Sequence, residues 1–307
     1  MPRVAERFSC ARESWALDEP LLATASQVVR WVVVEQPGTW GADALRESEL
    51  PREVGEELIR RCRRWGARPL LIRRAGGRAE GPRQVFVVSS APTATWARRI
   101  EIADAADVLD LDLESLAGDE PVAGEVVDGP LLLTCTNGRH DACCAEYGRG
   151  VAAVLDDAYP GRAWECSHIG GDRFAANVLC LPEGVYYGRV TPATAVGIAN
   201  LHAAGSLSLP HYRGRSVWPF DVQAAETLLR LHLGADGIDE VVPTTVRRPE
   251  RGVVDVELLV GDQRWRVELE VLPDPTPQQL TCGGTRPGHP PRYEIRELVA
   301  LPVQADA

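Results

Sequence analysis

The stretch from Cys135 to Asp172 constrains this chain more than any other, because it holds four of the eight cysteines. An apolar run, residues 131–133, leads into Thr134-Cys135, and a polar loop with a glycine follows. This pattern predicts a buried strand that delivers Cys135 to its carboxyl end. The loop is expected to hold Cys143 and Cys144 close by.

A second strand is predicted over residues 163–167, immediately before His168. His168 then enters a Gly-Gly turn that ends at Asp172. In an open α/β sheet, crevices form at the carboxyl ends of the strands. Two neighbouring strands would therefore bring thiols, an imidazole and a carboxylate together, which is typical of a metal site.

These residues resemble the sucrase/ferredoxin-like family. The family pattern has a cysteine, a basic-Asp pair, a second cysteine nine positions after the first, and then His-x-Gly-Gly-His. Cys135 and Cys144 match the two cysteines, and His140-Asp141 falls where the basic-Asp pair belongs. His168 matches the first histidine, whereas Asp172 replaces the second. The resemblance extends over residues 31–190 and includes the segments 174–177, 181–184 and 186–189.

The resemblance implies a thioredoxin-like ferredoxin fold that binds a [2Fe-2S] cluster. The implied ligands are Cys135, Cys144 and His168, with Asp172 as the leading fourth ligand. An anionic carboxylate in place of imidazole would favour the ferric state and lower the reduction potential. Three other thiols stay open as the fourth ligand: Cys166, two positions before His168 on a strand; Cys143, adjacent to Cys144; and Cys282, in a Gly-rich loop.

The order of predicted elements indicates a tandem arrangement. The first half has a strand at 28–35, a helix at 52–65, strands at 69–72, 84–89 and 96–102, and a helix at 103–116. The second half has a strand at 130–134, a helix at 145–159, a strand at 162–167, a hairpin at 178–181 and 185–190, and a helix at 192–204. We predict an α/β fold of tandem thioredoxin-like domains, over residues 1–120 and 128–210, joined by a linker at 118–129. An unrelated first α/β domain is the alternative.

The first copy lacks the metal-site residues. Its loop at 36–43, which corresponds to the cysteine loop, has no thiol.

After Pro210 the pattern changes, and residues 216–307 are predicted to form a small α+β domain. A helix is expected at 221–233 and strands at 254–260, 264–272 and 293–298.

Composition restricts the partners. The formal charge of -11 and the pI near 5.1 argue against nucleic acid and against an anionic membrane surface, because both require a surplus of basic residues. The N-terminus has no apolar signal core, so a soluble, cytoplasmic protein is expected. Cysteines in such a protein are expected to be reduced, metal-bound or buried, and Cys10, Cys62 and Cys180 are assigned to structural positions.

Other functions were weighed against electron transfer. A structural zinc site is chemically acceptable for two cysteines, a histidine and an aspartate. A thiol-dependent oxidoreductase would use Cys-x-x-Cys, which the pair Cys143-Cys144 does not form. A glycosidase would need two facing carboxylates, and no pair stands out. The sequence therefore favours an electron carrier or redox sensor that works with a separate redox partner protein over a stand-alone enzyme.

Overall fold

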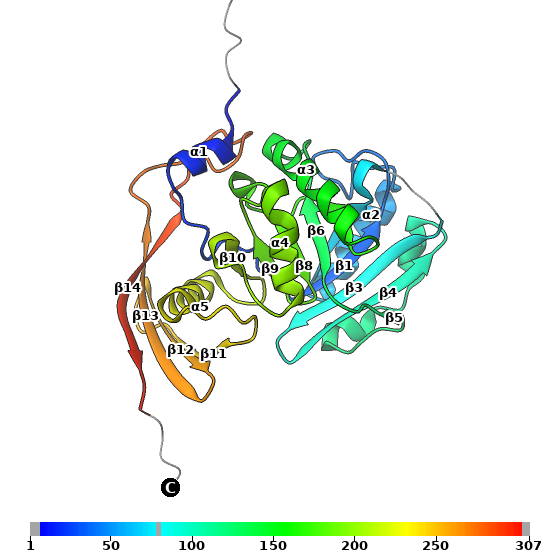
Figure 1. Cartoon of the computed structure of the whole chain (residues 1–307). Helices are drawn as coiled ribbons and strands as arrows, with labels where there is room; N and C mark the ends of the chain where they lie inside the picture. The colour runs from blue at the N-terminus through cyan, green and yellow to red at the C-terminus, as the bar shows by residue number, and fades with distance from the viewer. Residues whose placement is uncertain (1–6, 78–80, 303–307) are drawn as a thin grey trace, which may run out of the picture.

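The computed structural model describes residues 7–77 and 81–302. In this part of the chain, ten strands form one sheet in the order β10-β9-β8-β6-β7-β2-β1-β3-β4-β5, and four more form a second sheet. The protein is thus mixed α/β, with one large curled sheet and a separate small one (Figure 1). None of the helices described is both long and apolar enough to span a membrane.

The two halves of the large sheet have the same topology. The first half contains β1 (Arg30–Glu35), α2 (Arg52–Arg64), β2 (Ala67–Arg73), β3 (Arg83–Ala91) and β4 (Ala94–Ile102). The second contains β6 (Leu131–Cys135), α3 (Ala142–Ala158), β7 (Ala163–Cys166), β8 (Val178–Leu181) and β9 (Val185–Tyr187). In each half the first strand pairs in parallel with the strand after the helix and antiparallel with the next. A short antiparallel pairing of β2 with β7 joins the halves.

Three apolar layers explain why the sequences of these strands are continuous hydrophobic runs. The inner faces of both halves meet in one core that includes Trp31, Val33, Leu131 and Leu133. On the outer face of the first half, Leu58 and Cys62 of α2 pack against Val32 and Val34. On the outer face of the second half, α3 and α4 (Pro192–Ala203) cover Leu132 and Val178. In strands that are buried on both faces, apolar and polar residues do not alternate.

One expectation for the middle of the chain is wrong. The predicted helix at 103–116 is instead a pair of 3-10 helices, Ala105–Asp110 and Glu114–Gly118. The predicted linker at 118–129 contributes β5 (Glu125–Val126), which pairs with β4 at the edge of the sheet. The two halves share one sheet through the pairing of β2 with β7.

The C-terminal region forms a helix on a four-stranded antiparallel sheet. It follows β10 (Tyr212–Arg215) and consists of α5 (Phe220–Leu233), β11 (Val241–Arg247), β12 (Val253–Val260), β13 (Gln263–Pro273) and β14 (Pro291–Ala300). The sequence had not predicted β11. Val222 and Leu229 of α5 pack on Val256 and Val267 of the sheet. The loop from β13 to β14 leaves this sheet and reaches α1 (Cys10–Ala16) (Figure 1).

Candidate metal-binding centre

Cys135 lies at the carboxyl end of β6, in the innermost layer of the protein. Every residue of β6 is buried, and Cys135 is 1 % exposed. Its backbone N–H donates to the carbonyl of Asn177 at 3.0 Å. In the parallel pairing with β7, Cys135 stands opposite Cys166. The thiol is therefore fixed by a central strand and shielded from water.

Cys144 is held by the first turn of α3. The helix begins at Ala142, three residues before the predicted start, because the Asp141 side chain caps it by accepting the Cys143 N–H at 2.9 Å. Cys143 and Cys144 are thus on the helix and not in the loop where the sequence analysis expected them. Consecutive helical side chains point in different directions, and only Cys144 turns toward Cys135 and His168.

The turn after β7 presents His168. Gly170 and Gly171 both have positive φ, at 98° and 80°, which suits glycine. Three side chains fix the backbone of this turn: Arg68 donates to the His168 carbonyl at 2.7 Å, Ser26 to the Ile169 carbonyl at 2.8 Å, and Arg213 to the Gly170 carbonyl at 3.1 Å. The imidazole is thereby placed by residues from both halves.

The two thiols and the imidazole converge. Ligand atoms of Cys135, Cys144 and His168 all lie within 4.8 Å of one another. Asp172 adjoins this group: its Oδ1 accepts from the Cys144 thiol at 3.2 Å and lies 3.0 Å from Nδ1 of His168. Nδ1 of His168 is buried and makes no well-aligned hydrogen bond, so its contact with Asp172 is electrostatic. This nitrogen therefore remains available to coordinate a metal.

The electrostatics favour a thiolate at Cys135. The adjacent Cys144 thiol, followed by the imidazole of His168 and its charge, holds the pKa of Cys135 well below its usual range, against the effect of burial. Burial disfavours the charged form of His168, but polar contacts with Asp172 and Cys135 outweigh it and raise the pKa of His168 to about 9. A protonated imidazole at this position would offset the negative charge of a Cys135 thiolate and the Asp172 carboxylate.

His140 is a neighbour that the sequence analysis did not select. Its ring stacks on that of His168 with 3.6 Å between centroids. A ligand atom of His140 lies within 4.8 Å of those of His168 and Asp172. Its Nδ1 lies 3.2 Å from the carbonyl of Ala42, in the thiol-free loop of the first half. In the sequence, only the position of His140 in the His-Asp pair could have indicated that it lies near His168.

The histidine side of the centre is open to solvent. His140 is exposed, and the His168 side chain is 22 % exposed. An open hollow of about 540 Å³ adjoins both rings, with the loop at 42–45 and the start of β2 forming its other walls. The thiol side, in contrast, is closed. Any exchange with a second molecule would pass the imidazoles.

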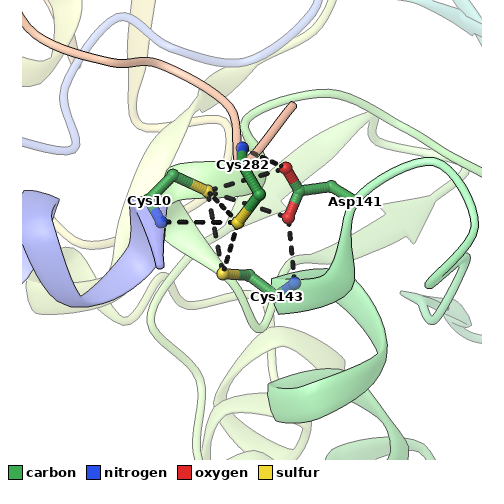
Figure 2. Close-up of side chains that lie close together, drawn as sticks. All are labelled: Cys10, Asp141, Cys143 and Cys282. Atoms are coloured by element: carbon green, nitrogen blue, oxygen red, sulfur yellow. Dashed lines mark hydrogen bonds between the residues drawn. The ribbon is translucent and has the colours of Figure 1, made fainter. Parts of the chain in front are cut away.

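The remaining cysteines fall into two classes. Cys62, Cys166 and Cys180 are buried in the apolar cores, and burial raises the pKa of each. Cys143 and Cys282, two of the alternatives for a fourth ligand, instead meet each other and Cys10 in a separate cluster (Figure 2). Cys10 had been assigned to a structural position.

The comparisons with known proteins agree with the residue pattern. A family model described as sucrase/ferredoxin-like matches residues 21–214, which span both halves of the large sheet. Cys10 and Cys282 lie outside this match. Comparisons with curated proteins and with solved structures give no match.

Proposed function

The chain belongs to the sucrase/ferredoxin-like family, and from that premise we propose that it binds a [2Fe-2S] cluster and transfers single electrons. The proposed ligands are Cys135, Cys144, His168 and Asp172. The observation that carries the proposal is the convergence of two buried thiols and an imidazole within 4.8 Å, at the ends of β6 and β7. We further propose that each half of the large sheet is a thioredoxin-like unit, related by duplication.

The donor set fits such a group chemically. Cluster iron is held by thiolates, with imidazole in some sites, and ligand thiols must lose their protons. The pKa of Cys135 is lowered, which favours a thiolate there, whereas Cys135 and burial raise the pKa of Cys144, so a metal would have to displace the Cys144 proton. Buried anions need a compensating positive charge, which a metal would provide in place of the His168 proton.

The chain's own residues would control redox exchange. When bound, the cluster supplies a one-electron couple whose potential depends on the balance of thiolate, imidazole and carboxylate ligands. Cys135 and Cys144 are buried and exclude water, whereas His168 borders the open hollow. A redox partner protein would dock at the histidine side. The burial of both thiols also argues against attack on a substrate disulfide, which would need an accessible thiolate.

The central test is iron content. Anoxically purified protein is expected to contain two irons and two acid-labile sulfides per chain, as a [2Fe-2S] cluster requires, with an EPR signal after dithionite reduction. Cys144→Ser is expected to lose the cluster because it removes a ligand. Cys62→Ser is the matched control, since Cys62 is equally buried but belongs to the outer core of the first half. Wild-type iron in the Cys144 variant would refute the ligand assignment, and zinc without sulfide in the wild type would indicate a structural site.

Asp172→His tests the fourth ligand. Replacing an anionic carboxylate by a neutral imidazole on the same iron should raise the reduction potential, by on the order of 100 mV, as histidine ligation does in Rieske centres. Redox titration followed by EPR or visible absorption measures the shift. His140→Ala is the companion variant and is expected to keep the full iron content. If it loses iron while Asp172→Ala retains it, the fourth position belongs to His140.

A further inference from the structure

A second cluster of metal-ligand residues joins three parts of the chain that are far apart in sequence. Cys10 starts α1, Asp141 and Cys143 lie at the start of α3, and Cys282 comes from the loop between β13 and β14 (Figure 2). All four ligand atoms lie within 4.8 Å of one another. Two of the four residues fall outside the family match, so family membership assigns no role to this cluster.

The separations match a single tetrahedral metal ion. The sulfur of Cys143 lies 3.7 Å from that of Cys10 and 3.3 Å from that of Cys282, and the sulfurs of Cys10 and Cys282 lie 3.6 Å apart. Zinc–sulfur bonds of about 2.3 Å at tetrahedral angles put ligand sulfurs about 3.8 Å apart. The carboxylate oxygens of Asp141 lie 3.8 and 3.7 Å from the Cys10 sulfur, near the roughly 3.5 Å expected for a sulfur and an oxygen on one zinc.

We propose that Cys10, Asp141, Cys143 and Cys282 bind one Zn²⁺ ion. Thiolate-rich tetrahedral sites select zinc over harder cations. Three thiolates and one carboxylate carry the same total charge as the four cysteines of a common structural zinc site. Four protein ligands leave no open coordination position, so the role is structural rather than catalytic.

Backbone groups orient these ligands as they do around known metal sites. The Cys10 N–H donates to the Cys282 sulfur at 3.5 Å, and the Ser9 hydroxyl lies 3.3 Å from the Cys143 sulfur. Asp141 accepts the N–H groups of Cys143 and Cys282, at 2.9 and 2.6 Å. The Cys10 thiol also donates to the Cys143 sulfur at 3.7 Å.

The zinc would tie α1 and the loop between β13 and β14 to the large sheet. The helix α1 has only seven residues, and the loop that carries Cys282 contains no helix or strand. The apolar cluster that joins these segments is small: it consists of Cys10, Ala11, Cys143 and Ala175, with Tyr147 and Cys282 packed against them. A four-ligand ion would hold both segments against the start of α3, one residue from Cys144.

The test measures zinc and iron in the same full-length samples. Wild-type protein expressed in zinc-supplemented medium and purified anoxically is expected to contain one zinc per chain. Cys282→Ser is expected to lose zinc and keep its iron, because Cys282 is half-buried and does not belong to the group formed by Cys135, Cys144 and His168. Cys144→Ser is expected to show the reverse, so failure of this proposal and failure of the electron-transfer proposal give different results.

Two controls keep the result interpretable. Cys62→Ser removes a buried cysteine outside both clusters and should retain both metals. Titration of the zinc-depleted wild type with Co²⁺ should give the visible absorption of a tetrahedral thiolate complex, and Cys282→Ser should give none. Wild-type protein without zinc, a second iron centre in its place, unchanged zinc in Cys282→Ser, or a disulfide among these cysteines by mass spectrometry would each overturn the proposal.

Discussion

Replacement of Arg230 by methionine is expected to lower the free energy of unfolding by about 3–5 kcal/mol, because it leaves Glu226 as an uncompensated buried charge. The two residues lie one turn apart on α5, with side chains 1 % exposed and an N–O distance of 2.5 Å. The guanidinium also donates to the carbonyls of Gly237 and Ile238, at 2.7 and 2.9 Å. The Tyr212 hydroxyl donates to the Glu226 carboxylate and lies 3.1 Å from both of its oxygens. The network therefore joins the C-terminal helix to β10, and denaturant unfolding followed by circular dichroism measures its loss.

Arg60→Met is the matched control for this prediction. Arg60 pairs with Glu57 on the exposed face of α2, and surface pairs contribute little because water screens both charges. We expect this variant to unfold almost as the wild type does. The double variant Arg230→Met, Glu226→Gln should recover part of the loss, since it removes the buried charge. Equal stability of Arg230→Met and Arg60→Met would contradict the argument.

The second large effect is expected at Gly148, where α3 crosses β6 at close range. A Cβ at this position would collide with the carbonyl oxygen of Cys135 and crowd Thr136. Gly148→Ala must therefore push α3 away from the strand, at a cost of about 1–3 kcal/mol. Cys144 lies one turn earlier on the same face of α3, so the same movement separates it from Cys135. We expect both lower stability and a lower iron content in the purified variant.

Gly197→Ala, in a neighbouring helix, is expected to change the free energy of unfolding in the opposite direction. Gly197 lies in α4 and is exposed, and a Cβ there meets no atom within 4 Å. Alanine should raise the free energy of unfolding by about 0.5–1 kcal/mol through reduced backbone entropy, with unchanged iron. If both variants shift stability in the same direction, the close approach of α3 and β6 does not matter.

The sequence predicted those features that depend on neighbouring residues. The strand before Cys135 and the helix at 192–204 appear within one residue of their predicted bounds, because apolar runs and a Thr-Pro helix start are local signals. The convergence of Cys135 and His168 also followed from local order, since adjacent parallel strands end at the same edge. The predicted helix at 145–159 leaves Asp141 in the loop before it, and therefore begins three residues after the observed start of α3.

Other features depend on contacts that no local pattern encodes. The predicted helix at 103–116 fails because Leu109, Leu111 and Leu113 recur every second residue, which does not make one helical face. Cys10 and Cys282 meet across 272 positions, so their approach depends on how the C-terminal sheet packs against the large one. The stacking of His140 on His168 likewise depends on the first half, whose loop contacts His140.

The pairing of β2 with β7 allows the first half to protect a sheet edge of the second. If the second half stood alone, β7 would be an edge strand with unpaired N–H and C=O groups, ready to pair with another chain. In the whole protein β2 occupies that edge, and the Ser167 N–H donates to the Leu71 carbonyl at 2.8 Å. The strand that leads to His168 is thereby kept from intermolecular β-pairing and aggregation. The first half, which supplies none of the candidate ligands, thus shields the sheet edge nearest the candidate metal-binding centre.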